Sequence, residues 1–88
     1  MSGNIIEVTA KFFAYYDELP KEQKKKFKKQ LTYLTHNPRH RSLQIHQLEG
    51  SGYWEFYVDK VYWCVFKRQG NNRYELHYVG SHDLIDNC

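Results

Sequence analysis

The spacing of apolar residues changes along the chain and predicts helices first and strands later. After a short apolar segment at residues 5–8, which we interpret as a strand, Phe12, Phe13, Tyr16 and Leu19 follow one another at helical spacings. Intervals of three and four residues are typical of an amphipathic helix. The first predicted elements are therefore a short strand and a helix.

A second helix is expected after Pro20. Proline suits the first turn of a helix, because the N–H group that it lacks has no partner there. Phe27, Leu31 and Leu34 then form one apolar stripe. We expect this helix to end at Asn37, because the residue before a proline disfavours helical geometry.

The rest of the chain alternates with a period of two, which predicts strands. Three such segments cover residues 53–58, 62–67 and 74–79. Polar or glycine-rich turns at 59–60 and 70–72 separate them. The three segments predict an antiparallel meander.

These elements predict one α+β domain over residues 1–88, a small antiparallel sheet with two N-terminal helices packed on one face. In the first strand of the meander, Trp54 and Phe56 alternate with Glu55 and Tyr57. Since successive side chains point to opposite faces, the two aromatics are expected in the core and the two polar residues away from it.

Composition narrows the class of protein. Aromatic residues make up 17% of the 88 residues, so a chain this short has enough apolar area for a core. No apolar run is long enough to cross a membrane, and no secretion signal precedes residue 5. Cys64 and Cys88 form neither a disulfide framework nor a metal motif. We expect a cytoplasmic protein with reduced thiols.

The net charge is +3, and the positive charges are unevenly distributed. Such clustering is typical of a surface that binds a polyanion or an acidic protein, although a solvated helix face gives the same pattern. His36 and His40 have the spacing of a helical metal pair, but Pro38 interrupts the helix that such a pair needs. The clustered lysines are Lys21, Lys24, Lys25, Lys26, Lys28 and Lys29.

Five segments, in this order and spacing, resemble the RelE/ParE superfamily of toxins from toxin-antitoxin systems. The segments are Asn-Pro-Arg-His at 37–40, His-Gln-Leu-Glu-Gly at 46–50, the strands at 53–58 and 62–66, and Val-Gly-Ser-His-Asp at 79–83. The second and the last are most similar to the YafQ-like branch of that superfamily.

The resemblance implies a small antiparallel sheet with two helices on one side. It also implies metal-independent cleavage of mRNA, usually on the ribosome, by a toxin that a cognate antitoxin holds in a larger assembly. No cofactor or metal is expected. Catalytic residues of YafQ-like members match His46 and His82, and further members of that site match Tyr57 and Glu55.

Acid-base chemistry is consistent with these residues. Cleaving RNA without a metal requires a base for the ribose 2′-hydroxyl, donors to the phosphorane and an acid for the departing 5′-oxygen. Histidine suits either proton transfer near neutral pH. Our hypothesis makes His82 the general acid and His46 the base or a phosphate ligand. Tyr57 would orient the phosphate or share the proton transfer, and Glu55 or Asp83 would orient a histidine.

The expected RNA-binding residues are cationic or aromatic. Arg39, Arg41, Lys60 and the helix lysines would bind phosphates in a salt-sensitive way. Trp63 stands where many members of the superfamily carry arginine, and it would stack on a base instead. This departure favours histidine chemistry or inactivity.

Each assignment has a structural alternative. His82 would then cap the last strand, His46 would be an exposed connector residue, and Tyr57 an ordinary cross-strand aromatic. His77 is expected to have a structural or surface role. The competing functions on the same fold are a ParE-like inhibitor of DNA gyrase and a catalytically silent relative that binds an antitoxin.

Overall fold

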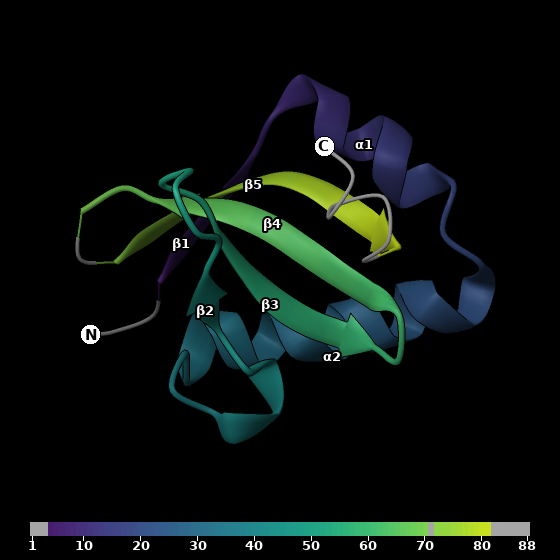
Figure 1. Cartoon of the computed structure of the whole chain (residues 1–88). Coiled ribbons are helices and arrows are strands. Elements are labelled where there is room, and N and C mark those ends of the chain that lie inside the picture. Colours follow the sequence, from purple (N-terminus) through teal and green to yellow (C-terminus); the bar gives the residue numbers. More distant parts are fainter. Residues whose placement is uncertain (1–3, 71, 82–88) are drawn as a thin grey trace.

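A computed structural model describes residues 4–70 and 72–81 of the chain (Figure 1). Two α-helices and a short 3₁₀ segment, η1, precede most of a five-stranded sheet. In chain order the elements are β1 (Ile5–Val8), α1 (Ala10–Asp17), α2 (Lys21–His36), η1 (Arg41–Leu43), β2 (His46–Gln47), β3 (Trp54–Asp59), β4 (Tyr62–Arg68) and β5 (Arg73–Ser81).

The sheet confirms the predicted α+β class and adds one pairing. Its strands lie in the order β1-β5-β4-β3-β2, and β2 to β5 pair antiparallel with their sheet neighbours. By contrast, β1 lies parallel to β5, with Ile6 opposite Tyr74, so the sheet is mixed rather than wholly antiparallel. A parallel pairing needs a long crossover, and the two helices lie within the long connection between β1 and β5.

The core lies between α2 and one face of the sheet. Phe27 of α2 stacks on Phe56 of β3, with 6.1 Å between ring centroids, and Leu34 is fully buried. Phe12 of α1 contacts Phe27 at 5.7 Å, so both helices contribute to one core. Burying a side chain of this size stabilises the fold by about 1.5–3 kcal/mol. The alternation predicted for β3 is thereby confirmed, with Phe56 in the core.

The two prolines set the limits of α2, although Pro20 precedes the first turn instead of lying in it. Pro20 is the N-cap, and its carbonyl accepts a hydrogen bond from the backbone N–H of Lys24 at 3.0 Å. The helix ends at His36, and Asn37 leaves helical geometry at φ −149° before Pro38. The connection then turns through η1 to β2, which brings the His46 segment to the edge of the sheet (Figure 1).

Candidate functional site

The candidate residues lie on the face of the sheet opposite α2, which we call the outer face. Glu55 and Tyr57 of β3 point there because Phe56 points into the core. The register places Glu55 beside Val65 and Tyr57 beside Trp63 on β4, and it places His46 of β2 on the other side of Glu55. His46, Glu55, Tyr57 and Trp63 therefore come together, and we call them the His46 cluster.

A short contact joins the histidine to the carboxylate. His46 Nε2 lies 2.6 Å from Glu55 Oε1, and His46 Nδ1 lies 3.0 Å from the backbone carbonyl of Gln44. The Glu55 side chain is completely buried, whereas that of His46 is 51% exposed. The pair thus connects a buried carboxylate to a histidine that solvent and ligands can reach.

These contacts occupy both ring nitrogens of His46. A carbonyl oxygen only accepts, so Nδ1 donates to Gln44. The distance of 2.6 Å between Nε2 and Oε1 is that of a hydrogen bond, so Glu55 holds the second ring nitrogen. Nε2 therefore becomes available to a ligand or a substrate proton only after it leaves Glu55.

Aromatic rings form the rest of the cluster. The Trp63 ring meets His46 edge to face at 5.4 Å between centroids and Tyr57 in the same way at 5.4 Å. Trp63 therefore lies between the two candidate polar side chains. Both Tyr57 and Trp63 are half-buried, so part of each ring remains accessible. A flat, partly exposed indole at this position is able to stack on a base.

Local backbone geometry sets the position of His46. Gln44 has a left-handed conformation, with φ 48°, that is uncommon for a residue other than glycine. This turn ends η1 and directs the Gln44 carbonyl to the His46 ring. After β2, Gly50 and Gly52 take φ values of 75° and 78° in the turn to β3. Glycine suits both positions, and the turn fixes the register that places His46 opposite Glu55.

A buried glutamine supports the cluster from the core side. Gln30 of α2 donates through Nε2 to the carbonyl oxygens of Tyr57, at 2.8 Å, and Ser42, at 3.1 Å. It is only 5% exposed. Gln30 therefore ties α2 both to the strand that carries Tyr57 and to the connection that leads to His46. The apolar stripe of α2 gave no sign of this role.

The predicted RNA-binding residues do not all join the cluster. Arg39 is exposed and lines a separate pocket of about 410 Å³, together with Arg68. Arg41 is an exposed residue of η1, and Lys60 is exposed in the turn between β3 and β4. Of this set, only Trp63 lies in the His46 cluster. The remaining predicted site residues, His82 and Asp83, lie outside the described residues.

A β-bulge in β5 places Tyr78 on the outer face beside His77, where regular alternation predicts only His77. Val65 pairs with Tyr78 but Phe66 pairs with Leu76, so His77 is an extra residue in the ladder. A bulge shifts the alternation by one residue, and His77 and Tyr78 consequently both line the outer face. The sequence of β5 alone does not show this bulge, because the change of register is defined only by the pairing of β5 with β4.

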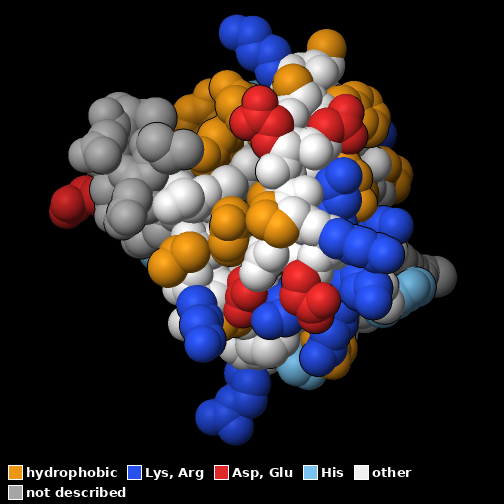
Figure 2. All heavy atoms as spheres, turned by 90° about the vertical axis from the view of Figure 1, so that its right-hand side faces the viewer, with side chains coloured by type: hydrophobic (Ala, Val, Ile, Leu, Met, Phe, Trp, Pro, Cys, Tyr) orange, Lys and Arg blue, Asp and Glu red, His pale blue; other side chains and the backbone are white. Residues whose placement is uncertain are grey.

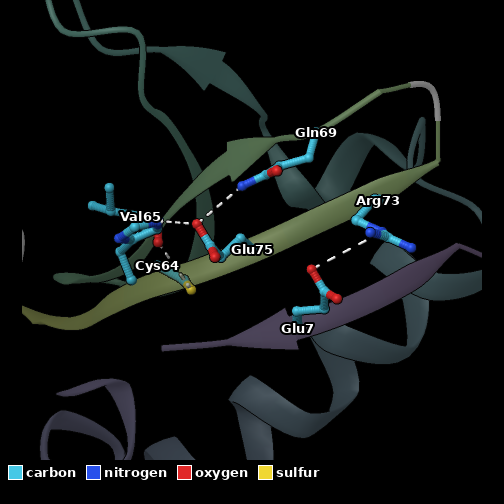
Figure 3. A network of polar contacts seen from close by, with 7 residues as sticks. Glu7, Cys64, Val65, Gln69, Arg73 and Glu75 are labelled. Carbon is cyan, nitrogen blue, oxygen red and sulfur yellow. Dashed lines mark hydrogen bonds and ion pairs between the residues drawn. The ribbon is translucent and has the colours of Figure 1, made fainter. Parts of the chain in front are cut away.

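The same strand carries a second histidine–carboxylate pair. His77 Nε2 lies 2.8 Å from Glu75 Oε1, which also accepts a hydrogen bond from Gln69 Nε2 at 3.1 Å. Figure 3 shows the contact from Gln69 to Glu75 and the neighbouring ion pair between Arg73 and Glu7. Both members are partly exposed, so this pair too faces a space that a ligand is able to enter.

The α2 lysines lie mainly at the surface, as expected for a charged helix face. Lys21, Lys25, Lys28 and Lys29 are exposed. Figure 2 shows Lys and Arg side chains gathered on part of one face of the molecule, with carboxylates among them. Lys26 pairs with Asp59 at 3.2 Å, so α2 is also anchored to the end of β3.

Asp59 itself is held in its ionised form. The backbone N–H of Lys60, the side chain of Gln23 at 2.7 Å and Lys26 all lower the pKa of this carboxyl, although burial acts in the opposite direction. These contacts connect the turn after β3 to the first half of α2. Asp59 therefore contributes to the fold on the face away from the His46 cluster.

Metal ligands and thiols do not add to the site within residues 4–70 and 72–81. These residues contain no group of three His, Cys, Asp or Glu side chains that could hold a metal ion. His40 stacks on Tyr33 at 3.7 Å and its Nδ1 contacts the Ser42 hydroxyl, so its ring packs against the protein.

Burial raises the pKa of the Cys64 thiol, which therefore stays protonated at neutral pH. In the same part of the chain no helix is long and apolar enough to cross a membrane.

Comparison with known proteins gives a structural likeness without a sequence match. No protein-family model and no curated protein matches the chain. The crystal structure of YafQ from E. coli strain BL21(DE3) is similar with a TM-score of 0.75 and 20% identity, over 93% of this chain and 97% of that chain. YafQ in the E. coli DinJ-YafQ toxin-antitoxin complex has a TM-score of 0.75 and 22% identity, over 93% and 96%.

An archaeal relative has the same architecture. The RelE-RelB complex from Pyrococcus horikoshii OT3 is similar with a TM-score of 0.72 and 15% identity, over 93% of this chain and 97% of that chain. At such identities the likeness concerns the fold. This chain thus has the α+β fold of the RelE/ParE superfamily toxins, as its resemblance to them implies.

Proposed function

We propose that the chain is the toxin of a toxin-antitoxin pair and that it cleaves mRNA without a metal ion. One observation carries this proposal: a solvent-accessible histidine, bonded to a buried carboxylate at 2.6 Å, lies beside Tyr57 and Trp63 on the outer face. The shared fold with YafQ and RelE supports the same reading. The partners would be a cognate antitoxin, mRNA and the ribosome, in the cytoplasm.

The proposed reaction is attack of the ribose 2′-oxygen on the adjacent phosphorus. A base takes the 2′-hydroxyl proton, the bond from phosphorus to the 5′-oxygen breaks, and an acid protonates the departing oxygen. We assign the acid role to His82. His46, held by Glu55, would bind the phosphate, or act as the base once Nε2 is released. Tyr57 would orient the phosphate, and Trp63 would stack on a base.

Charge outside the cluster would serve binding rather than chemistry. Arg39, Arg41, Lys60 and the exposed α2 lysines would contact RNA or ribosomal phosphates. Such contacts release counterions, so the affinity for RNA should fall as salt rises. Asp83 would orient His82 or cap the end of the chain.

A second function has one observation in its favour. Trp63 has no charge to donate to a phosphate, and a protein that inhibits gyrase or only binds its antitoxin needs no such charge. In either case the His46 cluster would be structural. The chain would then arrest growth through another target, or would not arrest it.

Induction in cells separates these functions. The wild type, His82→Ala and the control His36→Ala would each be expressed, and the 5′ ends of mRNA mapped. The proposal predicts growth arrest and new mRNA 5′ ends for the wild type and the control, and neither for His82→Ala. Arrest without new ends would favour gyrase or another target, and no arrest would favour a silent relative.

A further inference from the structure

A groove of about 800 Å³ opens on the outer face next to the His46 cluster. It lies between the start of α1 and the turn that joins β2 to β3. Val65, a small side chain between larger ones, forms its floor. The principal lining side chains are those of Tyr15, Leu48, Tyr53, Val65, His77 and Tyr78.

The β5 bulge gives the groove its aromatic wall. Because His77 and Tyr78 both face outward, two rings occupy a stretch where regular alternation would place one. Tyr15 packs edge-on against Tyr78, with 4.5 Å between centroids. The Tyr78 hydroxyl then extends over Gly80, where a Cβ atom would collide with it.

Polar groups complement these rings. Tyr53 meets His77 edge to face at 5.2 Å, and Lys67 Nζ lies 5.1 Å from the centre of the Tyr53 ring. Glu75 fixes His77 through the 2.8 Å contact that continues to Gln69, on the strands that Figure 3 shows in close-up. Lys11 also lines the groove. The site thus combines partly exposed aromatic rings, a held imidazole and the charged side chains of Lys11, Lys67 and Glu49.

The groove is continuous with the His46 cluster. Val65 pairs with Glu55 on one side and with Tyr78 on the other, so the groove floor and the buried carboxylate share one row of the sheet. Trp63 lies two residues from Val65 on the same strand and points to the same face. An extended polyanion with its phosphate at His46 would therefore place its next unit in the groove.

We propose that this groove is a nucleobase subsite, in which a base of single-stranded RNA stacks against Tyr53 and meets the imidazole of His77 at its edge. The inference deepens the proposed function and rests on it for the identity of the polymer. Bases stack on aromatic side chains without regard to sequence, and the neighbouring lysines match the charge of the RNA backbone. An apolar protein helix would bury Lys11 and the Glu75–His77 pair without replacing their contacts with water.

Binding of RNA that cannot be cleaved tests the subsite directly. A labelled 2′-O-methyl oligonucleotide lacks the attacking hydroxyl, so fluorescence anisotropy measures its affinity for the wild-type chain without turnover. Tyr53→Ala should weaken binding about tenfold, and Tyr53→Trp should restore it. The control Phe13→Ala removes an aromatic ring that is 56% exposed and does not line the groove, and it should leave binding unchanged.

An abasic version of the oligonucleotide shows whether the base is recognised. The wild type should bind it about tenfold more weakly than the intact oligonucleotide, and Tyr53→Ala should bind the two equally. Free nucleoside monophosphates provide a further arm. If a free nucleotide binds saturably to the wild type, displaces the oligonucleotide and loses affinity on Tyr53→Ala, the groove recognises the base itself, whether it comes from RNA or from a free nucleotide.

Two results would overturn the subsite. One is equal affinity of the wild type, Tyr53→Ala and His77→Ala for the intact oligonucleotide. The other is loss of binding to a purified antitoxin in these variants while RNA binding persists, which would assign the groove to protein. Failure of the proposed function looks different, because a chain that does not cleave mRNA would still lose RNA affinity on Tyr53→Ala if the subsite exists.

Discussion

Glu55 shows how far a residue pattern predicts its environment. The alternation of β3 correctly places its side chain on the face away from the core, yet the carboxylate is completely buried. The reason is not local: His46 comes from a different segment and contacts it at 2.6 Å. The resemblance made both residues candidates for a site, but their direct contact follows from the register between β2 and β3.

Removing the histidine should therefore affect stability as well as activity. His46→Ala deletes a charge-assisted hydrogen bond to a buried carboxylate, so we expect the free energy of unfolding to fall by about 1.5–3 kcal/mol. Urea denaturation at pH 7 measures this change. His36→Ala, an exposed histidine at the end of α2, should change stability by less than about 0.5 kcal/mol. Equal effects would show that the His46–Glu55 contact is not formed.

Asp59 predicts a pH dependence. Because the folded chain lowers the pKa of this carboxyl, its contribution to stability is present above the unfolded pKa and is lost as the pH falls through the folded pKa. Asp59→Asn should be less stable than the wild type at pH 7, and the difference should shrink below roughly pH 4. Thermal unfolding across this range measures it, and a difference that does not change with pH would contradict the assignment.

At the scale of elements, the helices and the meander follow from local pattern, whereas the pairings at the ends do not. Pro20 and Pro38 bound α2 through their own backbone chemistry. The parallel pairing of β1 with β5 joins residues nearly 70 positions apart (Ile5 opposite Arg73), and no local spacing encodes such a contact. The β5 bulge is likewise invisible in the sequence, because it is defined against β4.

The orientation that the bulge gives to Tyr78 leads us to expect that Gly80 tolerates no side chain. A Cβ atom there would collide with the Tyr78 ring and hydroxyl, so Gly80→Ala should destabilise the fold by about 1–3 kcal/mol. The same change in a Tyr78→Phe background should cost less, because the nearest atom is removed. Urea denaturation of the four chains forms a double-mutant cycle. Additive effects would mean that Tyr78 does not lie over Gly80.

At the scale of the molecule, the two faces of the sheet have different roles, because one packs on the core and the other carries the candidate site. α2 and the core cover one face, while the outer face carries the His46 cluster and the groove that adjoins it. The alternation of β3 predicted that Glu55 and Tyr57 would share that face, and the resemblance added His46 as a candidate, whereas the β5 bulge placed Tyr78 there without a sign in the sequence. The assignment of His82 stays a prediction, since residues 82–88 lie outside the described part of the chain.

The most direct measurement is the chemistry of the RNA ends that the protein produces. Cleavage by the neighbouring 2′-hydroxyl leaves a 2′,3′-cyclic phosphate on one fragment and a 5′-hydroxyl on the other, and it needs no metal ion. Purified chain would be incubated with ribosome-bound mRNA, and the RNA would then be separated from the ribosomes before its ends are identified. A parallel reaction on free RNA would contain excess EDTA. We predict cyclic phosphate and 5′-hydroxyl ends wherever cleavage occurs, whereas 5′-phosphate ends, or intact RNA in both reactions, would contradict the account.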